Sequence, residues 1–321
     1  MQKHVIGIDV GYGHTKVVTD TTGGMIVPVL FPSAVGTFEC GTVIDGLKAP
    51  EKDVVSFDGQ RFLVGASAIK HSGRLLESRE KNWIGSPAYK ALFLNALRLT
   101  ECNSIHLVIV TGLPVGFYGT DKDKLAHLVR EIAQGYCVDL TVRVIPQPLG
   151  SFFDRLLDES GKVKDNSLVT GRIGVVDIGY YTTDLLMVSD LEFVERQADS
   201  CENGVSTALE LIAKDIEQIH GMRPDIHATE QAIKQGWIKV FGERKGIFQI
   251  ADRRLGEIAR EIEAKVHIVW KAGSDIDQVL LTGGGAALLK GHLNLYKHAV
   301  VTVGAQVANA RGYFKFGRLS Q

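Results

Sequence analysis

Paired or clustered cysteines are missing from the sequence. Its four cysteines, Cys40, Cys102, Cys137 and Cys201, lie far apart and include no Cys-x-x-Cys pair. Their spacing therefore predicts neither a zinc knuckle nor a redox-active dithiol. We expect reduced, mostly packed thiols in a cytoplasmic protein.

Long apolar segments and an excess of one charge are also missing. Gly7 and Asp9 interrupt the first apolar stretch, so no secretory leader is expected. No apolar run approaches the roughly 18 residues that a membrane-spanning helix needs. Lys and Arg number 36 against 37 Asp and Glu, which gives a formal net charge of -1 and no positive excess to hold a polyanion. We therefore expect no membrane contact and no direct contact with nucleic acid.

The chain has 321 residues, of which 45% are hydrophobic, enough for roughly two domains with a core each. Strand patterns alternate with helix patterns, which predicts an α/β fold with largely parallel sheets made mixed by opening hairpins. The polar stretch 158–167 is the best candidate for a domain boundary. We expect strands at 5–10, 15–18, 25–30, 54–57, 61–64, 105–110, 140–145, 173–177, 183–188, 192–196 and 278–282. We expect helices at 86–99, 123–133, from 146 past 156, at 204–219, 228–237 and 250–270.

An internal repeat carries the strongest functional signal. Two eight-residue segments are similar: Asp9-Val10-Gly11-Tyr12-Gly13-His14-Thr15-Lys16 and Asp177-Ile178-Gly179-Tyr180-Tyr181-Thr182-Thr183-Asp184. They share Asp, Gly, Tyr and Thr at their first, third, fourth and seventh positions. Each segment follows a β-rich run, so each is expected to form the turn of a hairpin.

The residue types in these two turns favour phosphate binding. Glycine lets backbone N–H groups point into a concavity, and hydroxyl groups add further donors. Lys16 supplies a point charge for the phosphates, whereas Asp9 and Asp177 would repel phosphate and therefore imply a bridging cation, most simply Mg²⁺ with several waters. One hairpin alone favours an ordinary glycine turn with a solvated aspartate, but the pair favours phosphate binding. The candidate nucleotide-binding residues are Gly11, Tyr12, Gly13, His14, Thr15, Gly179, Tyr180, Tyr181, Thr182 and Thr183, although a turn histidine such as His14 is more often simply exposed.

A third glycine-rich segment follows the last predicted strand. Gly283, Gly284 and Gly285 would let a nucleoside approach the backbone closely, but they equally suit tight packing. The segment has neither Walker A nor Rossmann spacing.

Five motifs together, in this order, resemble those of the actin, Hsp70 and sugar-kinase superfamily of ATPases. They lie at 9–16, 146–150, 177–184, 281–286 and 307–312. The form of the second phosphate motif and the Ala-Asn-Ala-Arg-Gly-Tyr segment at 308–313 are most similar to the bacterial actin-like plasmid-segregation ATPases of the ParM/StbA type.

This resemblance implies two actin-like, ribonuclease H-like α/β domains around a nucleotide cleft that binds ATP or ADP with Mg²⁺. It also implies roles for four side chains. Gln147 would orient the attacking water, unless it only caps its helix. Asp177, with Asp9 as its counterpart, would hold Mg²⁺ through water, and Asp184 is a further carboxylate that could polarise water. The expected domains are 1–150 with 300–321, including a small inserted subdomain at 31–73, and 151–299.

The function that the resemblance implies is an ATPase that assembles head to tail into filaments and segregates plasmid DNA through a DNA-binding adaptor. The alternatives are a small-molecule kinase of the sugar-kinase type and a bacterial or archaeal actin homologue without a role in segregation. GTP in place of ATP stays open. Finally, we expect Trp83, Trp237 and Trp270 in the core or at subunit contacts, and the basic cluster 239–245 on a solvated face.

Overall fold

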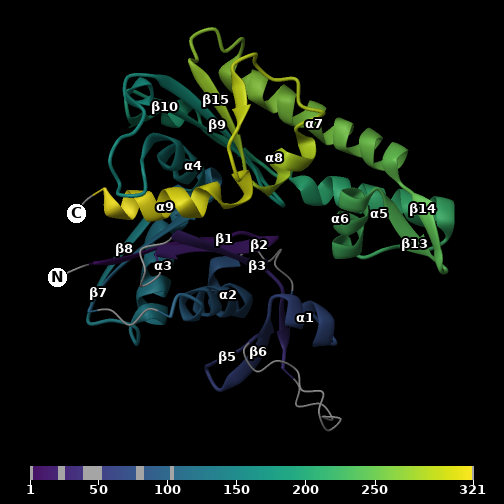
Figure 1. Cartoon of the computed structure of the whole chain (residues 1–321), viewed down its shortest axis with the longest axis horizontal. Helices are drawn as coiled ribbons and strands as arrows, with labels where there is room; N and C mark the ends of the chain where they lie inside the picture. The colour runs from purple at the N-terminus through teal and green to yellow at the C-terminus, as the bar shows by residue number, and fades with distance from the viewer. Residues whose placement is uncertain (1–2, 21–25, 39–52, 77–82, 102–104, 320–321) are drawn as a thin grey trace. The chain divides into compact units, whose positions relative to one another are not determined.

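The computed structural model describes residues 3–20, 26–38, 53–76, 83–101 and 105–319. Cys40, Cys102, Met25 of the third expected strand and positions 39–52 of the expected insertion lie outside the described residues. The chain divides into two compact units, one of residues Met1–Asn166 with Val307–Gln321 and one of residues Ser167–Gln306 (Figure 1). Within the described residues, no helix is long and apolar enough to cross a membrane.

The first unit is built on a five-stranded mixed sheet in the order β3-β2-β1-β7-β8. The first three strands are antiparallel, while β7 and β8 run parallel to β1, as the sequence predicted. The strands are β1 (His4–Val10), β2 (His14–Asp20), β3 (Ile26–Pro32), β7 (His106–Leu113) and β8 (Asp139–Pro146).

Helices cover both faces of this sheet, because side chains alternate along each strand. Ile6 and Ile8 of β1 lie in one apolar cluster with α2 and α3, whereas Val5 lies in another with α9. Gly7 has no room for a side chain against the backbone of α9. The helices of the unit are α2 (Pro87–Arg98), α3 (Val115–Ala133), α4 (Gln147–Leu156) and α9 (Ala308–Arg318).

Two of these helices test the predicted boundaries. The side chain of Ser86 caps α2 by accepting from the backbone N–H of Tyr89, as expected from the Ser-Pro pair. The expected helix at 123–133 is longer than predicted, since α3 begins at Val115. Gly116 and Gly119 in its first turns are weak helix formers, so the local sequence conceals this start.

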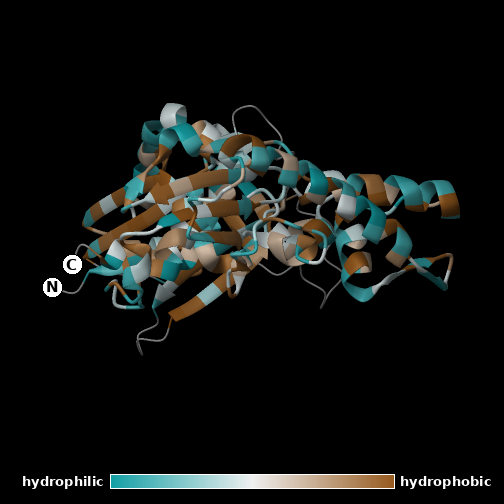
Figure 2. Cartoon of the chain, turned by 90° about the horizontal axis from the view of Figure 1, so that it is seen from above, coloured by the Kyte–Doolittle hydropathy of each residue, from teal (hydrophilic) through white to brown (hydrophobic). Residues whose placement is uncertain are grey.

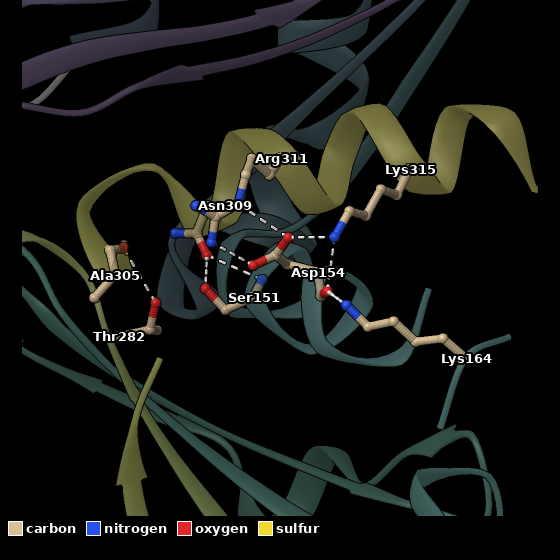
Figure 3. Close-up of polar contacts among 8 residues, drawn as sticks. All are labelled: Ser151, Asp154, Lys164, Thr282, Ala305, Asn309, Arg311 and Lys315. Carbon is tan, nitrogen blue, oxygen red and sulfur yellow. Dashed lines mark hydrogen bonds and ion pairs between the residues drawn. The ribbon is translucent and has the colours of Figure 1, made fainter. Parts of the chain in front are cut away.

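Helices α4 and α9 cross closely at paired glycines and are joined by buried charges. A side chain on Gly312 would collide with the carbonyl of Gly150. Asp154 of α4 accepts from Arg311 at 2.6 Å and from Lys315 at 2.7 Å, both on α9 (Figure 3). The first unit therefore includes the C-terminal helix as part of its packed core.

A small three-stranded sheet in the order β4-β6-β5 completes the described part of the first unit. Asp58 and Gly59 join β5 to β6 with φ of 51° and 73°, which confirms the expected type I′ turn. The elements here are β4 (Val35–Thr37), β5 (Val54–Phe57), β6 (Gln60–Val64), α1 (Ala66–His71) and a 3-10 helix at Trp83–Gly85.

The second unit repeats the sheet design of the first. Its strands follow the order β11-β10-β9-β15-β16, with β12 also paired to β10. The expected strand at 192–196 is wrong beyond Phe193, because β11 ends there and a 3-10 helix at Glu195–Gln197 lets β12 pair with the start of β10. The strands are β9 (Arg172–Ile178), β10 (Thr183–Ser189), β11 (Glu192–Phe193), β12 (Asp199–Cys201), β15 (Gln278–Thr282) and β16 (Ala299–Val301).

A hairpin of β13 (Trp237–Val240) and β14 (Glu243–Gly246) was not predicted. The helix expected to reach Trp237 ends at Gln235, because Gly236 takes a left-handed conformation with φ of 81°. The basic cluster 239–245 therefore lies on a hairpin, with Lys239 and Arg244 exposed.

The helices of the second unit have apolar stripes, and Figure 2 shows hydrophobic colour along the sheet strands and mixed colour along the helices. The predicted stripe of α7 is buried at Leu255, Ile258, Ile262 and Val266, and Trp270 is buried at its end. The helices are α5 (Val205–His220), α6 (Ile226–Gln235), α7 (Phe248–Trp270) and α8 (Gly284–Leu289).

Candidate nucleotide site

The first hairpin pairs an aspartate with a lysine. Asp9 of β1 lies directly opposite Lys16 of β2, and the lysine Nζ is 2.9 Å from Asp9 Oδ2. Their side chains are only 4% and 12% exposed. Directly opposed residues of an antiparallel pair share one face of the sheet, so the two charges neutralise each other within the hairpin.

Gln147 joins this pair from the start of α4. Its Nε2 donates to Asp9 Oδ1 at 3.2 Å, and its own carbonyl accepts from the hydroxyl of Tyr313 on α9 at 3.3 Å. Gly112 at the end of β7 leaves the space that this tyrosine ring occupies. The structure thus brings Asp9, Lys16 and Gln147 together, although 138 residues separate the aspartate from the glutamine.

Ser33 holds the turn of the first hairpin, and sequence reasoning missed it. Its hydroxyl donates to the carbonyl of Gly11 at 2.5 Å, and its backbone N–H donates to the carbonyl of Gly13 at 3.0 Å. The fully buried Thr15 hydroxyl lies 2.9 Å from Ser33 Oγ, so it contacts this anchor. Ser33 has no recognisable motif of its own, and its role follows only from the pairing of β3 with β2.

An aromatic stack supports the same turn. The ring of Tyr12 stacks on Trp83 at 5.2 Å between centroids, and Trp83 meets the edge of Tyr89 at 5.6 Å. Burial, followed by the nearby negative charge of Asp9, raises the pKa of Tyr89 well above its ordinary value. Trp83 is therefore a core residue, as predicted. His14 is half-buried at the first position of β2.

The second hairpin opposes two aspartates. Asp177 of β9 lies directly opposite Asp184 of β10, and both residues are buried. Thr182 Oγ1 donates to Asp184 Oδ2 at 3.1 Å, and the Gly179 N–H donates to the Thr182 carbonyl at 2.8 Å. Like charges that face each other across a strand pair are unfavourable, so this position suits a cation.

The segment 203–206 anchors the second turn, much as Ser33 anchors the first. The hydroxyl of Thr183 donates to the carbonyl of Asn203 at 2.6 Å, and the N–H of Ser206 donates to the carbonyl of Tyr180 at 2.8 Å. Gly204 has no room for a side chain against Tyr180. The rings of Tyr180 and Tyr181 meet edge to face at 4.8 Å.

The three glycines 283–285 begin beside Asp177 of the second hairpin. Gly283 has φ of 84°, and a side chain there would collide with Asp177 Oδ1 and the carbonyl of Ile178. A side chain on Gly285 would collide with Ile178 and Val205, whereas at Gly284 the nearest contact among the described residues is with Gln306, at 3.8 Å. Close packing therefore requires two of the three glycines.

These carboxylates fit a water-bridged magnesium ion better than a fully protein-bound one. Among the described residues, no group of three or more His, Cys, Asp or Glu could hold a metal ion. Mg²⁺ commonly keeps several waters and needs only one or two carboxylates. Asp177 and Asp184 meet that need, whereas Lys16 and Gln147 already contact the two oxygens of Asp9.

Two family models match the chain. A model described as the N-terminal domain of actin-like proteins matches residues 7–150, and one described as archaeal actin homologue, MreB-like, C-terminal matches residues 175–295. An archaeal actin homolog of Thermoplasma volcanium is 26% identical over 304 residues, which covers 89% of this chain and 88% of that protein.

Solved structures agree along nearly the whole chain. A Clostridium botulinum ParM in a 15-stranded filament is 20% identical, with a TM-score of 0.79 and 99% coverage of both chains. An archaeal actin homolog in complex with ADP is 21% identical, with a TM-score of 0.73 and 97% coverage of both chains. Bacillus thuringiensis ParM with AMPPNP is 14% identical, with a TM-score of 0.69 and full coverage of both chains. The chain therefore has the actin-like ATPase fold, with ParM proteins and archaeal actin homologues as its structural neighbours.

Proposed function

We propose that this protein is a Mg²⁺-dependent ATPase that assembles into filaments when it binds ATP. The observation that carries the proposal is the repeated hairpin, with Asp9 and Lys16 in one copy and Asp177 and Asp184 in the other. Neighbours of the same fold were solved with ADP or AMPPNP or in a filament, which supports a nucleotide ligand and self-assembly.

In this proposal each group has a separate task. Lys16 moves from Asp9 to the phosphates, and the turns at 11–15 and 179–183 provide backbone and side-chain donors. Asp177 and Asp184 would hold the waters of Mg²⁺, and Asp9 would be a further carboxylate for these waters. Mg²⁺ would neutralise charge on the phosphates. Gln147, already within hydrogen-bond reach of Asp9, orients the attacking water, and the glycines 283–285 pack against the nucleoside.

The experiment that tests this function is sedimentation over a protein concentration series with Mg-ATP, Mg-ADP or no nucleotide, with phosphate release measured in parallel. We expect pelleting above a critical concentration with Mg-ATP, and its loss in Asp177→Ala. Asp277→Asn, which alters an exposed carboxylate at the opposite end of the same sheet and outside the turn motifs, serves as the control. A wild-type protein that binds ATP but stays in the supernatant at every concentration would contradict the filament function. Sugars would then be screened as phosphate acceptors.

We further propose that the filaments segregate plasmid DNA through a DNA-binding adaptor in the cytoplasm. The ParM neighbours support a segregation role, and the formal charge of -1 favours delegating DNA contact to another protein. A direct test is a gel-shift titration of the assembled filaments with duplex DNA at physiological salt, where we expect no shift. Loss of a host plasmid after deletion of the gene would support segregation. Stable plasmid inheritance would favour an actin homologue without that role, as the archaeal relatives permit.

A further inference from the structure

Two turns of the second unit hold apolar side chains in an unfavourable backbone conformation. Phe241 and Gly242 form the two-residue turn between β13 and β14, with φ of 46° and 92°. Asp190 and Leu191 form the turn between β10 and β11, with φ of 52° and 63°. Positive φ is rare for bulky side chains, because Cβ then crowds the backbone.

The β5–β6 turn of the same chain shows the ordinary solution. It uses Asp58 and Gly59 with similar φ angles, and these residue types tolerate the conformation. Phe241 and Leu191 gain little internal packing in exchange for their strain, since they are 87% and 49% exposed. Further burial of these two side chains therefore requires contact with another molecule.

The β13–β14 hairpin combines aromatic and basic side chains, and we call the set Trp237, Lys239, Phe241, Arg244 and Phe248 the basic tip. Lys239 and Arg244 lie directly opposite each other, and the Arg244 guanidinium lies 4.3 Å from the Trp237 ring centroid. Phe248, just after the hairpin, is 72% exposed. Within the residues that the structure describes, neither cation forms an ion pair with a carboxylate.

The β10–β11 turn combines apolar and acidic side chains, and we call the set Asp190, Leu191, Glu192, Phe193 and Glu195 the acidic turn. All five residues are exposed. Among the strands that the structure describes, β11 lies at the edge of its sheet and pairs with β10 alone. The acidic turn thus offers apolar surface and negative charge, which complement the aromatic rings and positive charge of the basic tip.

The basic tip and the acidic turn lie at opposite ends of the second unit. Helix α7 begins at Phe248, beside the tip, and its 23 residues span roughly 34 Å. Its last residue, Trp270, packs on Gly174 and donates from Nε1 to the carbonyl of Gln197. Gly174 pairs with Met187, three residues before Asp190, so the far end of α7 lies near the acidic turn (Figure 1).

We propose that the basic tip of one copy docks on the acidic turn of the next copy. This contact rests on the proposed filament function and names the surfaces that build it. A second copy is favoured over another occupant because the two patches complement each other and face opposite ends of one unit. A contact between two different patches repeats from copy to copy, and it generates an open filament where the rotation between copies does not close a ring.

Phe241→Asn tests the tip without disturbing its fold, because Asn-Gly is the preferred pair for this turn. With Mg-ATP we expect the critical concentration to rise roughly 10-fold or more, as for loss of an aromatic anchor. The melting temperature and nucleotide affinity should stay at the wild-type values or above. Val138→Ser, which alters another side chain that is 87% exposed, serves as the matched control and should leave assembly unchanged.

Leu191→Gly tests the acidic turn by the same logic, since Asp-Gly also suits this turn. At protein concentrations below these raised critical concentrations neither variant alone should assemble, but an equal mixture retains one intact tip and one intact turn. With Mg-ATP we therefore expect heterodimers in the mixture by analytical ultracentrifugation, and monomers of each variant alone.

Three outcomes overturn the contact. Unchanged assembly of Phe241→Asn shows that the tip does not build the filament, whatever else it binds. Normal assembly of Leu191→Gly, with Phe241→Asn defective, shows that the tip contacts a different surface. Failure of the wild type to sediment with Mg-ATP overturns the filament function itself, and this contact with it.

Discussion

The two hairpins share one backbone design but differ in how they balance charge. In the first, Asp9 opposes Lys16, and the hairpin contains its own counter-ion. In the second, the same position opposes Asp177 to Asp184. One repeat therefore sets opposite charges against each other, whereas the other sets two buried carboxylates against each other.

This difference predicts how each hairpin responds to a substitution. A buried ion pair loses stability when either partner is removed, because the remaining charge is left without compensation. Two opposed carboxylates gain stability when a cation binds, or when one of them becomes neutral. The same substitution should thus have opposite effects on stability in the two hairpins.

The largest effect is expected from Asp9→Asn. It leaves the 12%-exposed Lys16 charge unpaired and should lower the free energy of unfolding by about 3–5 kcal/mol, measured by urea denaturation. The double variant Asp9→Asn with Lys16→Met removes both charges and should recover most of that loss. A single variant as stable as the wild type would contradict the buried ion pair.

Asp177→Asn should lower the rate of ATP hydrolysis. Loss of one carboxylate near the phosphates should lower ATP turnover roughly 100-fold, about 2.7 kcal/mol of transition-state stabilisation, measured by phosphate release. Asp277→Asn alters a carboxylate at the opposite end of the same sheet, where it accepts from the Arg172 N–H, and serves as the control. Equal turnover in the wild type and in Asp177→Asn would show that this aspartate takes no part in ATP hydrolysis.

Asp184→Asn tests whether the two opposed carboxylates of the second hairpin destabilise the protein without Mg²⁺. Without Mg²⁺ it relieves repulsion with Asp177 and should raise the free energy of unfolding by roughly 1 kcal/mol, the scale of a cross-strand pair. Adding Mg-ATP should raise the melting temperature of the wild type more than that of the variant. A variant less stable than the wild type without Mg²⁺ would show that Asp184 is satisfied by its protein partners alone.

The smallest expected effect is on how stability depends on pH. It concerns the first hairpin, because β1 begins with His4, whereas the equivalent position of β9 is Arg172. Burial lowers the pKa of His4 below its ordinary value of 6.5, and Arg318 lowers it further against the opposing effect of Asp20. The folded state thus binds this proton less readily than the unfolded state, so stability falls as pH drops below 6.5. His4→Gln should flatten that part of the melting-temperature profile. An identical profile in the variant would assign the acid sensitivity to other groups.

Local sequence signals predicted the parts of the fold that depend on neighbouring residues. The Ser86-Pro87 start of α2, the Asp58-Gly59 turn and the apolar stripe of α7 each follow from residue types at fixed spacing. The β13–β14 hairpin was missed because its turn, Phe241-Gly242, lacks the residue usual at its first position.

The same distinction holds for the candidate site, where local patterns revealed some residues and strand pairing was needed to find others. The repeat revealed Asp9, Lys16, Asp177 and Asp184, because glycine turns after β-rich runs leave a visible pattern. Ser33 stayed hidden, since its contacts with Gly11 and Gly13 arise only when β3 pairs with β2.

By itself, the sequence determined that this chain has an α/β fold with two related hairpins, because periodicity and glycine placement act over a few residues. Only the tertiary structure decided that Asp9 meets Gln147 and that Asp177 lies beside Gly283. It alone also placed Phe241 and Leu191 on strained, exposed turns. Those outcomes depend on which distant segments pack together, and strand pairing and helix crossing settle that over the whole unit rather than within a window of sequence.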